Sequence, residues 1–510
     1  MTHDSQKSDC CTVAKKPTNA RSAASGESVE RRRQAEGNAE GSSTHRTQGR
    51  ESVSQGLDRV RERAKAKRQE KFTALLHHVD VERLRKAYYA LKRDSAAGID
   101  GITWTQYGEG LEVNIVKLHD EIHRGAYRAL PSKRQYIPKA DGQRRALGIA
   151  ALEDKIAQRA VVEVLNAIYE QDFLGLSYGF RPRRSQHDAL DALAYGIGRR
   201  EVNFIVDADI QRFFDSMSHQ WLMEFLKHRI GDERVLRLIA KWLKAGVMDA
   251  GELTVSEEGT AQGAVISPLL ANIFLHYVFD LWAERWRRRH AQGDMIIVRY
   301  ADDTVVGFEH EADAKRFMEE LHVRLAQFAL TLHPGKTRLI EFGRHAVERR
   351  AQRGVGKPET FNFLGFTHIC GRTKAGHFLL KRKTRRDRLR AKLRALKREL
   401  RQCLHAPIAE QGKWLGQVVR GYFAYHAVPT NSQRLRAFRY HLVILWLRTL
   451  KRRSQKDRTT WNDMARLAKE FLPLPRIRHP WPDKRFLVKH PRWEPSALIA
   501  PARFCAGGAQ

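Results

Sequence analysis

The chain has 510 residues, and its 42% hydrophobic content is enough for two or three domains with their own cores. Its 92 Lys and Arg residues outnumber 58 Asp and Glu residues, and the net charge of +34 is far more than solubility requires. A polyanion is therefore the expected partner, although a generic solvated basic surface, as in ribosomal or chromatin proteins, would show the same excess.

The cysteines and the apolar runs exclude several classes of protein. No C-x-x-C pair occurs among Cys10, Cys11, Cys370, Cys403 and Cys505, so neither a zinc knuckle nor a disulfide framework is expected. We expect the protein to occupy a reducing compartment. The polar first seventy residues contain no apolar signal region, and no run approaches a membrane-spanning length. We expect a cytoplasmic protein with no membrane partner.

The chain begins with a polar segment. Residues 1–54 hold almost no large apolar side chain and are expected to be a disordered tail. From Leu57 to about Leu91 the pattern becomes helical, and from Gly101 to Phe366 strand-like and helical segments alternate, which indicates an α+β region. The later part of the first helical stretch carries apolar residues at helical spacings, namely Leu75, Leu76, Val79, Val81, Leu84 and Tyr88.

Two acidic motifs follow predicted strands. Asn203 to Ile210 alternates as a strand, and Asp209 closes it. Further along, Asp302 and Asp303 lie between the apolar runs Met295 to Val298 and Thr304 to Phe308, which predicts a β-hairpin with adjacent carboxylates at its tip. Aspartates are common turn formers, so an ordinary turn is the alternative. On neighbouring strands of one sheet, Asp209 and Asp302 would share divalent metal ions.

After Phe366 the pattern becomes helical and strongly basic. Two stripes run along one predicted helix, one apolar and one cationic: Leu389, Leu393, Leu396 and Leu400 beside Arg390, Arg394, Lys397 and Arg401. Trp414 to Tyr425 and Phe438 to Leu450 then mix aromatic and basic residues, a composition that suits structured RNA. Most of these rings are expected in the core, and a solvated helix face is the alternative for the basic stripe.

Several blocks together resemble a known family. Gly259 to Asn272 (GTAQGAVISPLLAN) resembles the dNTP-site block of reverse transcriptases. The remaining blocks resemble those of group II intron-encoded reverse transcriptase/maturases, from about Phe72 onward: Ala97 to Gly101, Ile137 to Ile149, Ser177 to Ser185 with His187, Ala189 and Leu190, Leu332 to Thr337, Phe363 to Phe366, Gly421 to His426 and Arg452 to Gln455.

The resemblance implies a right-hand polymerase, with fingers and an antiparallel palm sheet followed by a helical thumb and a maturase domain. The implied divisions are a tail at 1–54, an N-terminal helical extension with fingers and palm at 55–366, a thumb at 367–405, a maturase (RNA-binding) domain at 406–490 and a C-terminal tail at 491–510. After Arg453 no nuclease pattern is visible, so the form lacking the C-terminal endonuclease domain is expected.

The resemblance also implies roles for single residues. Two Mg²⁺ ions would be held by Asp209, Asp302, Asp303 and the Ile210 carbonyl. Incoming nucleotide would meet Lys139, Arg145, Gln262, Gly263 and Lys336, with Phe214 as the wall under the sugar and Phe213 as its competitor. Phe363, Leu364, Gly365 and Phe366 would form the primer grip. RNA would be contacted by Arg390, Arg394, Lys397, Arg401, Arg420, Arg452 and Arg453. Ala146 stands where the family usually has Pro, and we expect a looser turn there.

The implied function is RNA-directed DNA polymerisation on a group II intron, with help for splicing and mobility. Its partners would be the intron RNA, an RNA template with a DNA primer, target DNA and dNTPs, in a bacterial-type cytoplasm near the nucleoid. Two alternatives stay open: a splicing or RNA-binding factor on a polymerase scaffold, and a retron or defence-type reverse transcriptase.

Overall fold

The computed structural model describes residues 56–138, 144–255, 257–454 and 456–489. These form two compact units, a larger unit within residues 56–359 and a smaller unit within residues 360–488, and each is described by itself. Their helices and mainly antiparallel sheets confirm the predicted α+β class. The tails predicted at 1–54 and 491–510 lie outside the described residues.

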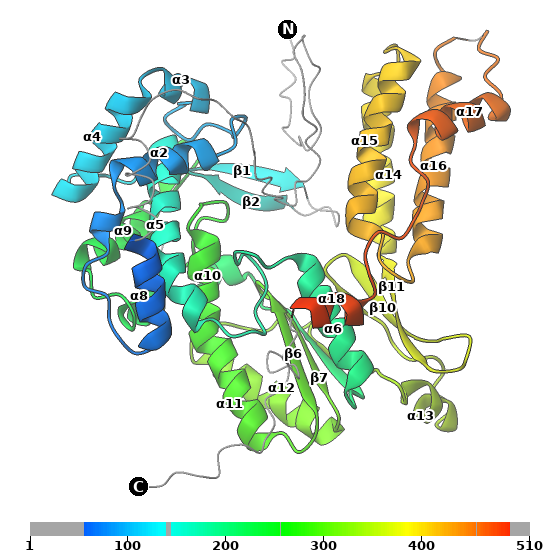
Figure 1. Ribbon diagram of the computed structural model, residues 1–510, viewed down its shortest axis with the longest axis horizontal. Helices are drawn as coiled ribbons and strands as arrows, with labels where there is room; N and C mark the ends of the chain where they lie inside the picture. The colour runs from blue at the N-terminus through cyan, green and yellow to red at the C-terminus, as the bar shows by residue number, and fades with distance from the viewer. Residues whose placement is uncertain (1–55, 139–143, 256, 455, 490–510) are drawn as a thin grey trace. The chain divides into compact units, whose positions relative to one another are not determined.

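The larger unit contains two four-stranded sheets (Figure 1). The first has the order β2-β1-β4-β5 and is built from β1 (Ser132–Pro138), β2 (Arg144–Ile149), β4 (Val247–Asp249) and β5 (Glu252–Thr254). The second has the order β6-β7-β3-β8 and is built from β3 (Phe204–Ala208), β6 (Met295–Tyr300), β7 (Asp303–Phe308) and β8 (Arg338–Glu341).

The helices of the larger unit are mostly amphipathic, and most of them share one hydrophobic core with the second sheet. In chain order they are η1 (Leu76–His78), α2 (Val81–Ala90), α3 (Trp104–Glu109), α4 (Leu111–Arg124), α5 (Leu152–Asp172), α6 (Gln186–Arg199), α7 (Phe213–Ser216), α8 (His219–Lys227), α9 (Glu233–Lys244), α10 (Ser267–Leu275), the π-helical turn η2 (His276–Asp280), α11 (Leu281–His290), α12 (Glu311–Ala326) and α13 (Ala346–Gln352).

The expected helical stretch from Leu57 to Leu91 is interrupted. A helix occupies residues 56–66 and α2 begins only at Val81, with the short η1 between them. The carboxylate of Asp232 accepts the backbone N–H groups of Leu75 and Leu76 at 2.8 and 3.0 Å, so a residue distant in sequence holds the chain in this break. The apolar spacing predicted buried positions, and a tertiary hydrogen bond decided where the helices end.

The second sheet places the acidic motifs. Strand β3 pairs antiparallel with β7 on one side and with β8 on the other. Helix α12 packs against β3 and β7, and α6 packs against β6 (Figure 1). Phe317 of α12 fixes this packing, because its ring centroid lies 5.3 Å from that of Phe308 and 5.1 Å from that of Trp286.

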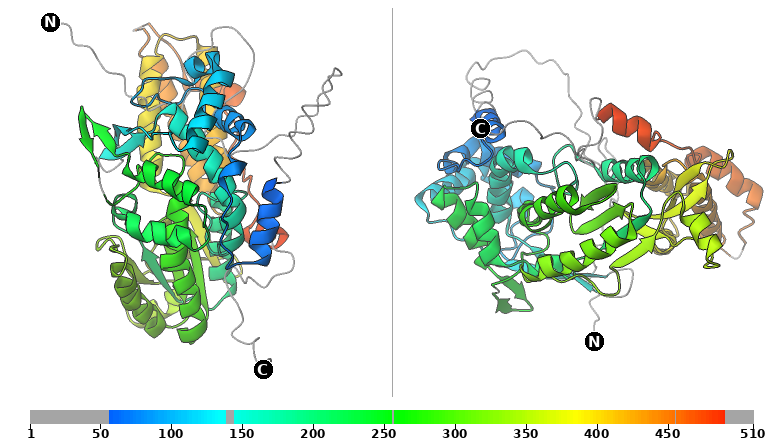
Figure 2. Two further views of the ribbon diagram at one scale, coloured as in Figure 1. Left: turned by 90° about the vertical axis from the view of Figure 1, so that its left-hand side faces the viewer. Right: turned by 90° about the horizontal axis from the view of Figure 1, so that it is seen from below.

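The smaller unit joins a three-stranded sheet to a group of helices. Its sheet has the order β11-β10-β9, from β9 (Phe361–Phe363), β10 (Phe366–Arg372) and β11 (Phe378–Thr384). The helices that follow are α14 (Arg386–Gln402), α15 (Ile408–His426), α16 (Ser432–Leu450), α17 (Trp461–Phe471) and α18 (Pro482–Lys489). Figure 2 shows the yellow and orange helices α14, α15 and α16 side by side, and these with α17 share one hydrophobic core.

Helix α14 has the two stripes that its sequence predicts. Leu389, Leu396 and Leu400 are buried in the shared core and Leu393 packs against it. The four basic residues of the neighbouring stripe are all exposed, namely Arg390, Arg394, Lys397 and Arg401. The apolar stripe is therefore confirmed as the packing face, and the charges lie in solvent.

The predicted domain divisions do not coincide with the compact units. The smaller unit begins at Thr360, and Phe366, where the palm was expected to end, pairs with both Phe363 and Thr384 inside its sheet. The segments 367–405 and 406–490 supply α14 and α15–α17 to one core. As functional divisions, the boundaries at 366 and 405 stay predictions.

Truncating the packing stripe should cost far more stability than truncating the exposed one. Leu396 has no exposed surface, so Leu396→Ala should lower the free energy of unfolding by about 2–5 kcal/mol through lost burial and a cavity. The matched variant Arg394→Ala should change it by less than about 0.5 kcal/mol. Urea denaturation of both variants measures this, and equal losses would contradict the assignment of the two faces.

Candidate active site

Asp302 lies in the tight turn of the β6–β7 hairpin. Tyr300 pairs with Asp303, so Ala301 and Asp302 form a two-residue connection. Ala301 has φ of +58°, the left-handed conformation that such connections require. The hairpin predicted from the apolar runs is therefore confirmed, and its tip carries the acidic pair.

Asp209 lies at the same end of the neighbouring strand. Ala208, the last residue of β3, pairs with Thr304, so Asp209 follows at the level where β7 begins. The Asp209 carbonyl accepts the backbone N–H of His333 at 2.7 Å, and its carboxylate accepts the Lys336 ammonium at 2.9 Å. The adjacency predicted for two carboxylates distant in sequence is thus present in the sheet register.

Burial and the neighbouring charges shift the pKa of Asp302. Burial raises the pKa of the Asp302 carboxyl, and the nearby Asp209 carboxylate raises it further. The guanidinium groups of Arg145 and Arg299 act in the opposite direction and favour the ionised form. Two carboxylates that repel each other in a half-buried place form a site for a cation.

The backbone at Ile210 presents an additional oxygen. Ile210 forms an antiparallel bridge with Leu332, flanked by hydrogen bonds that use the Asp209 carbonyl and the Gln211 N–H. In this pattern the bridged residue directs its own carbonyl away from Leu332, toward the side of β3 on which β7 lies. The predicted Ile210 ligand therefore points toward the hairpin tip.

The donor set suits a hard divalent cation such as Mg²⁺, because it consists of oxygens at one edge of a rigid sheet. No group of three His, Cys, Asp or Glu side chains within the described ranges converges as a ready-made metal cluster. Asp303 is exposed, and as the first residue of β7 it alternates with the buried Thr304. The structure brings Asp209 and Asp302 together, and the role of Asp303 stays a prediction.

The loop that resembles the dNTP-site block lies against the first sheet. The Gly148 N–H of β2 donates to the Gln262 carbonyl at 2.8 Å. Gly263 has φ of +120°, and an added Cβ would lie 2.8 Å from the Gly148 carbonyl oxygen, so only glycine fits. Strand β2 also carries Arg145. One strand therefore positions Arg145 and, through Gly148, the loop with Gln262 and Gly263, all of them predicted to contact the nucleotide.

The two phenylalanines after Asp209 have different environments. Phe213 is buried and meets Phe274 edge to face, with ring centroids 6.2 Å apart. Phe214 is only partly buried, and its carbonyl accepts the Thr260 N–H at 2.8 Å, which ties it to the loop ahead of Gln262. Phe214 is thus the better placed of the two predicted sugar walls.

The remaining predicted finger residues divide between described and undescribed positions. Lys139 lies outside the described residues. Ala146 lies within β2 opposite Tyr136, so the expectation of a loosened turn at this position is wrong. The departure from proline falls in a strand, where alanine is compatible with regular pairing.

The predicted primer grip is a tight hairpin turn. Leu364 and Gly365 have φ of +45° and +80° and connect β9 to β10. Phe363 and Phe366 are buried, which leaves the turn itself for any contact with a primer. The Leu364 carbonyl accepts the Tyr425 hydroxyl at 2.7 Å, and this bond holds the turn on α15.

Two of the three remaining predicted RNA contacts are exposed. Arg420 and Arg452 lie in solvent, whereas Arg453 donates to the carbonyls of Leu404 (2.7 Å) and Ala406. Arg453 therefore holds the connection between α14 and α15. As expected, most rings of this region are core, including Tyr422, Phe423, Phe438 and Trp446.

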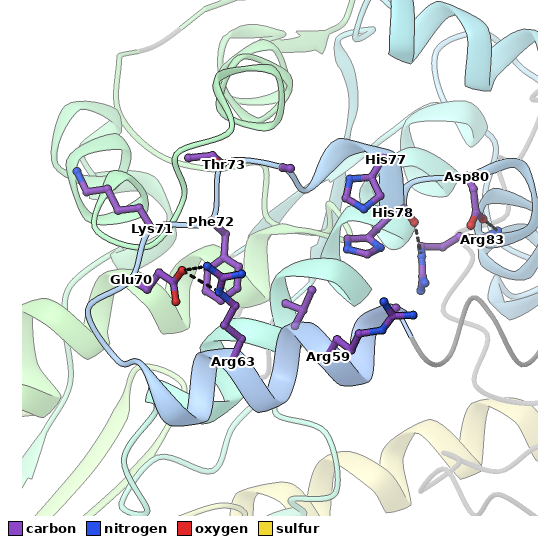
Figure 3. Close-up of a pocket in the computed structure, with 13 residues that line it drawn as sticks. Arg59, Arg63, Glu70, Lys71, Phe72, Thr73, His77, His78, Asp80 and Arg83 are labelled. Carbon is purple, nitrogen blue, oxygen red and sulfur yellow. Dashed lines mark hydrogen bonds and ion pairs between the residues drawn. The ribbon is translucent and has the colours of Figure 1, made fainter.

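A separate basic cavity of about 530 Å³ lies in the N-terminal part of the larger unit (Figure 3). Its lining includes Arg59, the ion pair of Arg63 with Glu70, and His78. Burial lowers the pKa of His78 to about 4, so this ring is neutral near pH 7. None of the lining residues belongs to the acidic site.

Sequence reasoning missed the residues beneath the hairpin tip. Arg299, Asp280 and Asn272 are buried, and the Arg299 guanidinium donates hydrogen bonds to the side chains of both other residues. The available signal was a lone arginine between the apolar run of β6 and the turn, since a charge at a buried strand position needs a partner.

Comparison with known proteins agrees with this geometry. Residues 137–368 match the family described as reverse transcriptase (RNA-dependent DNA polymerase). That range includes β3, the dNTP-site block and the β6–β7 hairpin. This part of the chain is therefore similar to a reverse transcriptase domain.

Individual relatives point to the intron-encoded branch. The chain is 40% identical over 200 residues to "Protein YkfC" of Escherichia coli, covering 39% of this chain and 52% of the relative. It is 34% identical over 224 residues to "Group II intron-encoded protein LtrA" of Lactococcus lactis, covering 43% and 37%. It is 25% identical over 432 residues to "Putative COX1/OXI3 intron 1 protein" of Saccharomyces cerevisiae, covering 71% and 51%.

These matches confirm the resemblance to group II intron reverse transcriptase/maturases. The chain spans about half the length, or less, of these relatives. Within the described residues, no helix has the length and apolar character needed to cross a membrane.

Removing the charge of Asp302 should stabilise the metal-free protein. The raised pKa means that folding favours the protonated carboxyl, so stability should rise as pH falls through that pKa and be lowest above it. At pH 7.5, Asp302→Asn should raise the free energy of unfolding by about 1 kcal/mol. The exposed neighbour serves as control, and Asp303→Asn should change it by less than about 0.5 kcal/mol. Chemical denaturation in EDTA measures both, and a loss of stability in Asp302→Asn would contradict the electrostatic account.

Proposed function

We propose that this protein is a group II intron RNA-directed DNA polymerase that copies intron RNA by two-metal nucleotidyl transfer and assists splicing and mobility. The observation that carries the proposal is the meeting of Asp209 and Asp302 at one sheet edge, within electrostatic reach of Arg145. The family match and the intron-encoded relatives support the same assignment.

The sheet edge with Asp209 and Asp302 would hold the metal ions and, through them, the primer 3′ end and the nucleotide triphosphate. Asp209, Asp302 and the Ile210 carbonyl are the residues that would hold Mg²⁺, with Asp303 as a further candidate. When bound, two such ions polarise the attacking 3′ hydroxyl and neutralise charge on the leaving pyrophosphate. The protein's own contribution is rigid placement, because these oxygens come from paired strands.

The residues around this edge would bind the nucleotide. Arg145 would hold the triphosphate through its guanidinium fork, as would Lys139 through its ammonium. Gln262 and Gly263 would line the base and sugar, and Phe214 would exclude a 2′ hydroxyl by contact. Lys336 would donate a proton to the leaving pyrophosphate, and the 2.9 Å hydrogen bond from its ammonium to the Asp209 carboxylate supports this role.

The smaller unit would hold RNA and primer. The exposed stripe of α14 presents four cations in register with successive helical turns, a spacing that suits contacts with a phosphate backbone. Arg420 and Arg452 extend the exposed basic surface of this unit. The Leu364–Gly365 turn would contact the primer through its backbone.

Primer extension tests the polymerase assignment. On an RNA template with Mg²⁺ and dNTPs, Asp209→Asn and Asp302→Asn should each lower the extension rate by at least about 100-fold. Asp207→Asn is a matched control, because Asp207 lies on the same strand and pairs with Arg338 at 3.6 Å; its rate should stay within about two-fold. Activity equal to the parent's in both site variants would reject the site. An inactive parent that still promotes intron splicing would favour a splicing factor on a polymerase scaffold.

Salt dependence tests the basic stripe. Changing Arg390, Arg394, Lys397 and Arg401 together to Gln should weaken intron RNA binding and lower the slope of log affinity against log salt by about 3. The fold should remain intact, because all four side chains are exposed. Filter binding between 50 and 300 mM KCl measures the slope, at values chosen to span roughly the physiological range. An unchanged slope would remove this face from the RNA interface.

A further inference from the structure

The residue beneath the hairpin tip is an arginine with every donor satisfied. Arg299 of β6 has 1% of its surface exposed, and a guanidinium presents five N–H donors. Two go to the Asp280 carboxylate at 2.7 and 2.6 Å, and one each to the Asn272 side-chain oxygen (3.1 Å), the Ser177 hydroxyl (2.8 Å) and the Ala301 carbonyl (2.9 Å). All five N–H donors of the guanidinium therefore have acceptors, and the side chain is held in one orientation.

The bond to Ala301 acts directly on the turn. The Ala301 carbonyl belongs to the peptide group that joins Ala301 to Asp302, so the guanidinium fixes the orientation of that peptide. Ala301 also has positive φ, a conformation that costs energy for any residue with a Cβ and persists only where its surroundings hold it. The Arg299 fork supplies such a hold from inside the protein.

The other bonds anchor the fork to a loop and to the continuous helical run of α10 and η2. Asp280 is the last residue of η2, Asn272 belongs to α10, and Ser177 lies in the loop before α6. Asn272 also donates to the Gly179 carbonyl at 2.7 Å, and Gly179 lies so close to the Ala301 backbone that no Cβ would fit there. The loop and the dNTP-site helix are thus fastened to the turn through one side chain.

The charges of this cluster balance internally. Arg299 and Asp280 form a buried ion pair with no exposed surface on Asp280. Burial lowers the pKa of the adjacent His276 to about 4, so that ring adds no charge near pH 7. A buried pair of this kind adds little net stability compared with apolar side chains, but it imposes a specific geometry.

We propose that Arg299, paired with Asp280, is a positioning residue that sets the peptide before Asp302 and so aims the Asp302 carboxylate. The fork does not touch substrate, and it acts only through the turn. The kinetic part of the proposal rests on the polymerase function proposed above, whereas the structural part does not.

Arg299→Lys is the test variant. Lysine keeps the charge but offers three donors at one point, so it cannot hold Asp280, Asn272 and Ala301 together. We expect kcat for primer extension to fall about 30-fold or more, with KM for dNTP within about three-fold. The reason is that the Asp302 carboxylate loses its fixed orientation, whereas the residues that bind dNTP are unchanged. Backbone hydrogen exchange across residues 300–303 should become at least about ten-fold faster.

Arg229→Lys is the matched control. Arg229 is also buried in the larger unit, pairs with Asp172 at 2.8 Å and donates to the carbonyls of Lys67 and Glu70 at 2.9 and 3.0 Å, but it has no bond to the hairpin. Its variant should lose comparable stability, keep kcat within about three-fold and leave exchange at 300–303 unchanged. Equal losses of kcat in both variants would overturn the positioning role, as would unchanged exchange at the turn in Arg299→Lys.

Two further outcomes are distinguishable. If Arg299→Lys fails to fold, Ser177→Ala removes one of the five bonds and keeps the ion pair; exchange at the turn should rise measurably, and an unchanged rate would overturn the proposal. If the parent protein shows no polymerase activity, the proposed function fails, and the exchange comparison of Arg299→Lys with Arg229→Lys still decides the positioning role.

Discussion

The repulsion between Asp209 and Asp302 is the constraint on which the site depends. Strand pairing puts these carboxylates at one sheet edge, where burial and mutual repulsion raise the pKa of Asp302. Three nearby cations partly offset this repulsion. Lys336 donates a hydrogen bond to Asp209, Arg145 lies on β2, and Arg299 lies beneath the turn. A site that is unfavourable without a cation is the expected condition for metal-dependent chemistry, because the strain is relieved only when opposing charge is bound.

The arginines of this strongly basic chain fall into two populations. Arg181, Arg229 and Arg299 are buried, and each pairs with an acidic side chain: Glu170, Asp172 and Asp280. These pairs impose geometry on loops and turns. The four cations of the α14 stripe, Arg390, Arg394, Lys397 and Arg401, are exposed instead, which leaves them for a polyanion. The net charge of +34 counts both populations equally. It therefore does not show which cations hold the fold together and which are free to bind a polyanion.

The sequence predicted local periodicity well and long-range contacts only through motif resemblance. Alternation located β3 and the β6–β7 hairpin, and the 4-3-4 leucine spacing located the buried face of α14. Phe214 was preferred over Phe213 only through the resemblance, because the pattern alone does not show which ring the strand-to-helix turn sends into the core. Arg453 looked like an RNA contact, yet two carbonyls in the connection before α15 bind it. Hydrogen bonds between segments distant in sequence decided the role of Arg453 and the helix break at Leu75 and Leu76, and composition does not encode them.

The shared core of the smaller unit has a consequence for how RNA binding would act. Leu389, Leu396 and Leu400 of α14 pack with residues of α15, α16 and α17, so the predicted thumb helix and the predicted maturase helices have no separate cores. A phosphate backbone held on the cationic stripe would therefore fix the orientation of the whole helical group and not of one helix alone. Conversely, RNA contacts at Arg420 or Arg452 would constrain α14 through the same packed side chains. Binding by the predicted thumb helix and binding by the predicted maturase helices would then be coupled through a single rigid core.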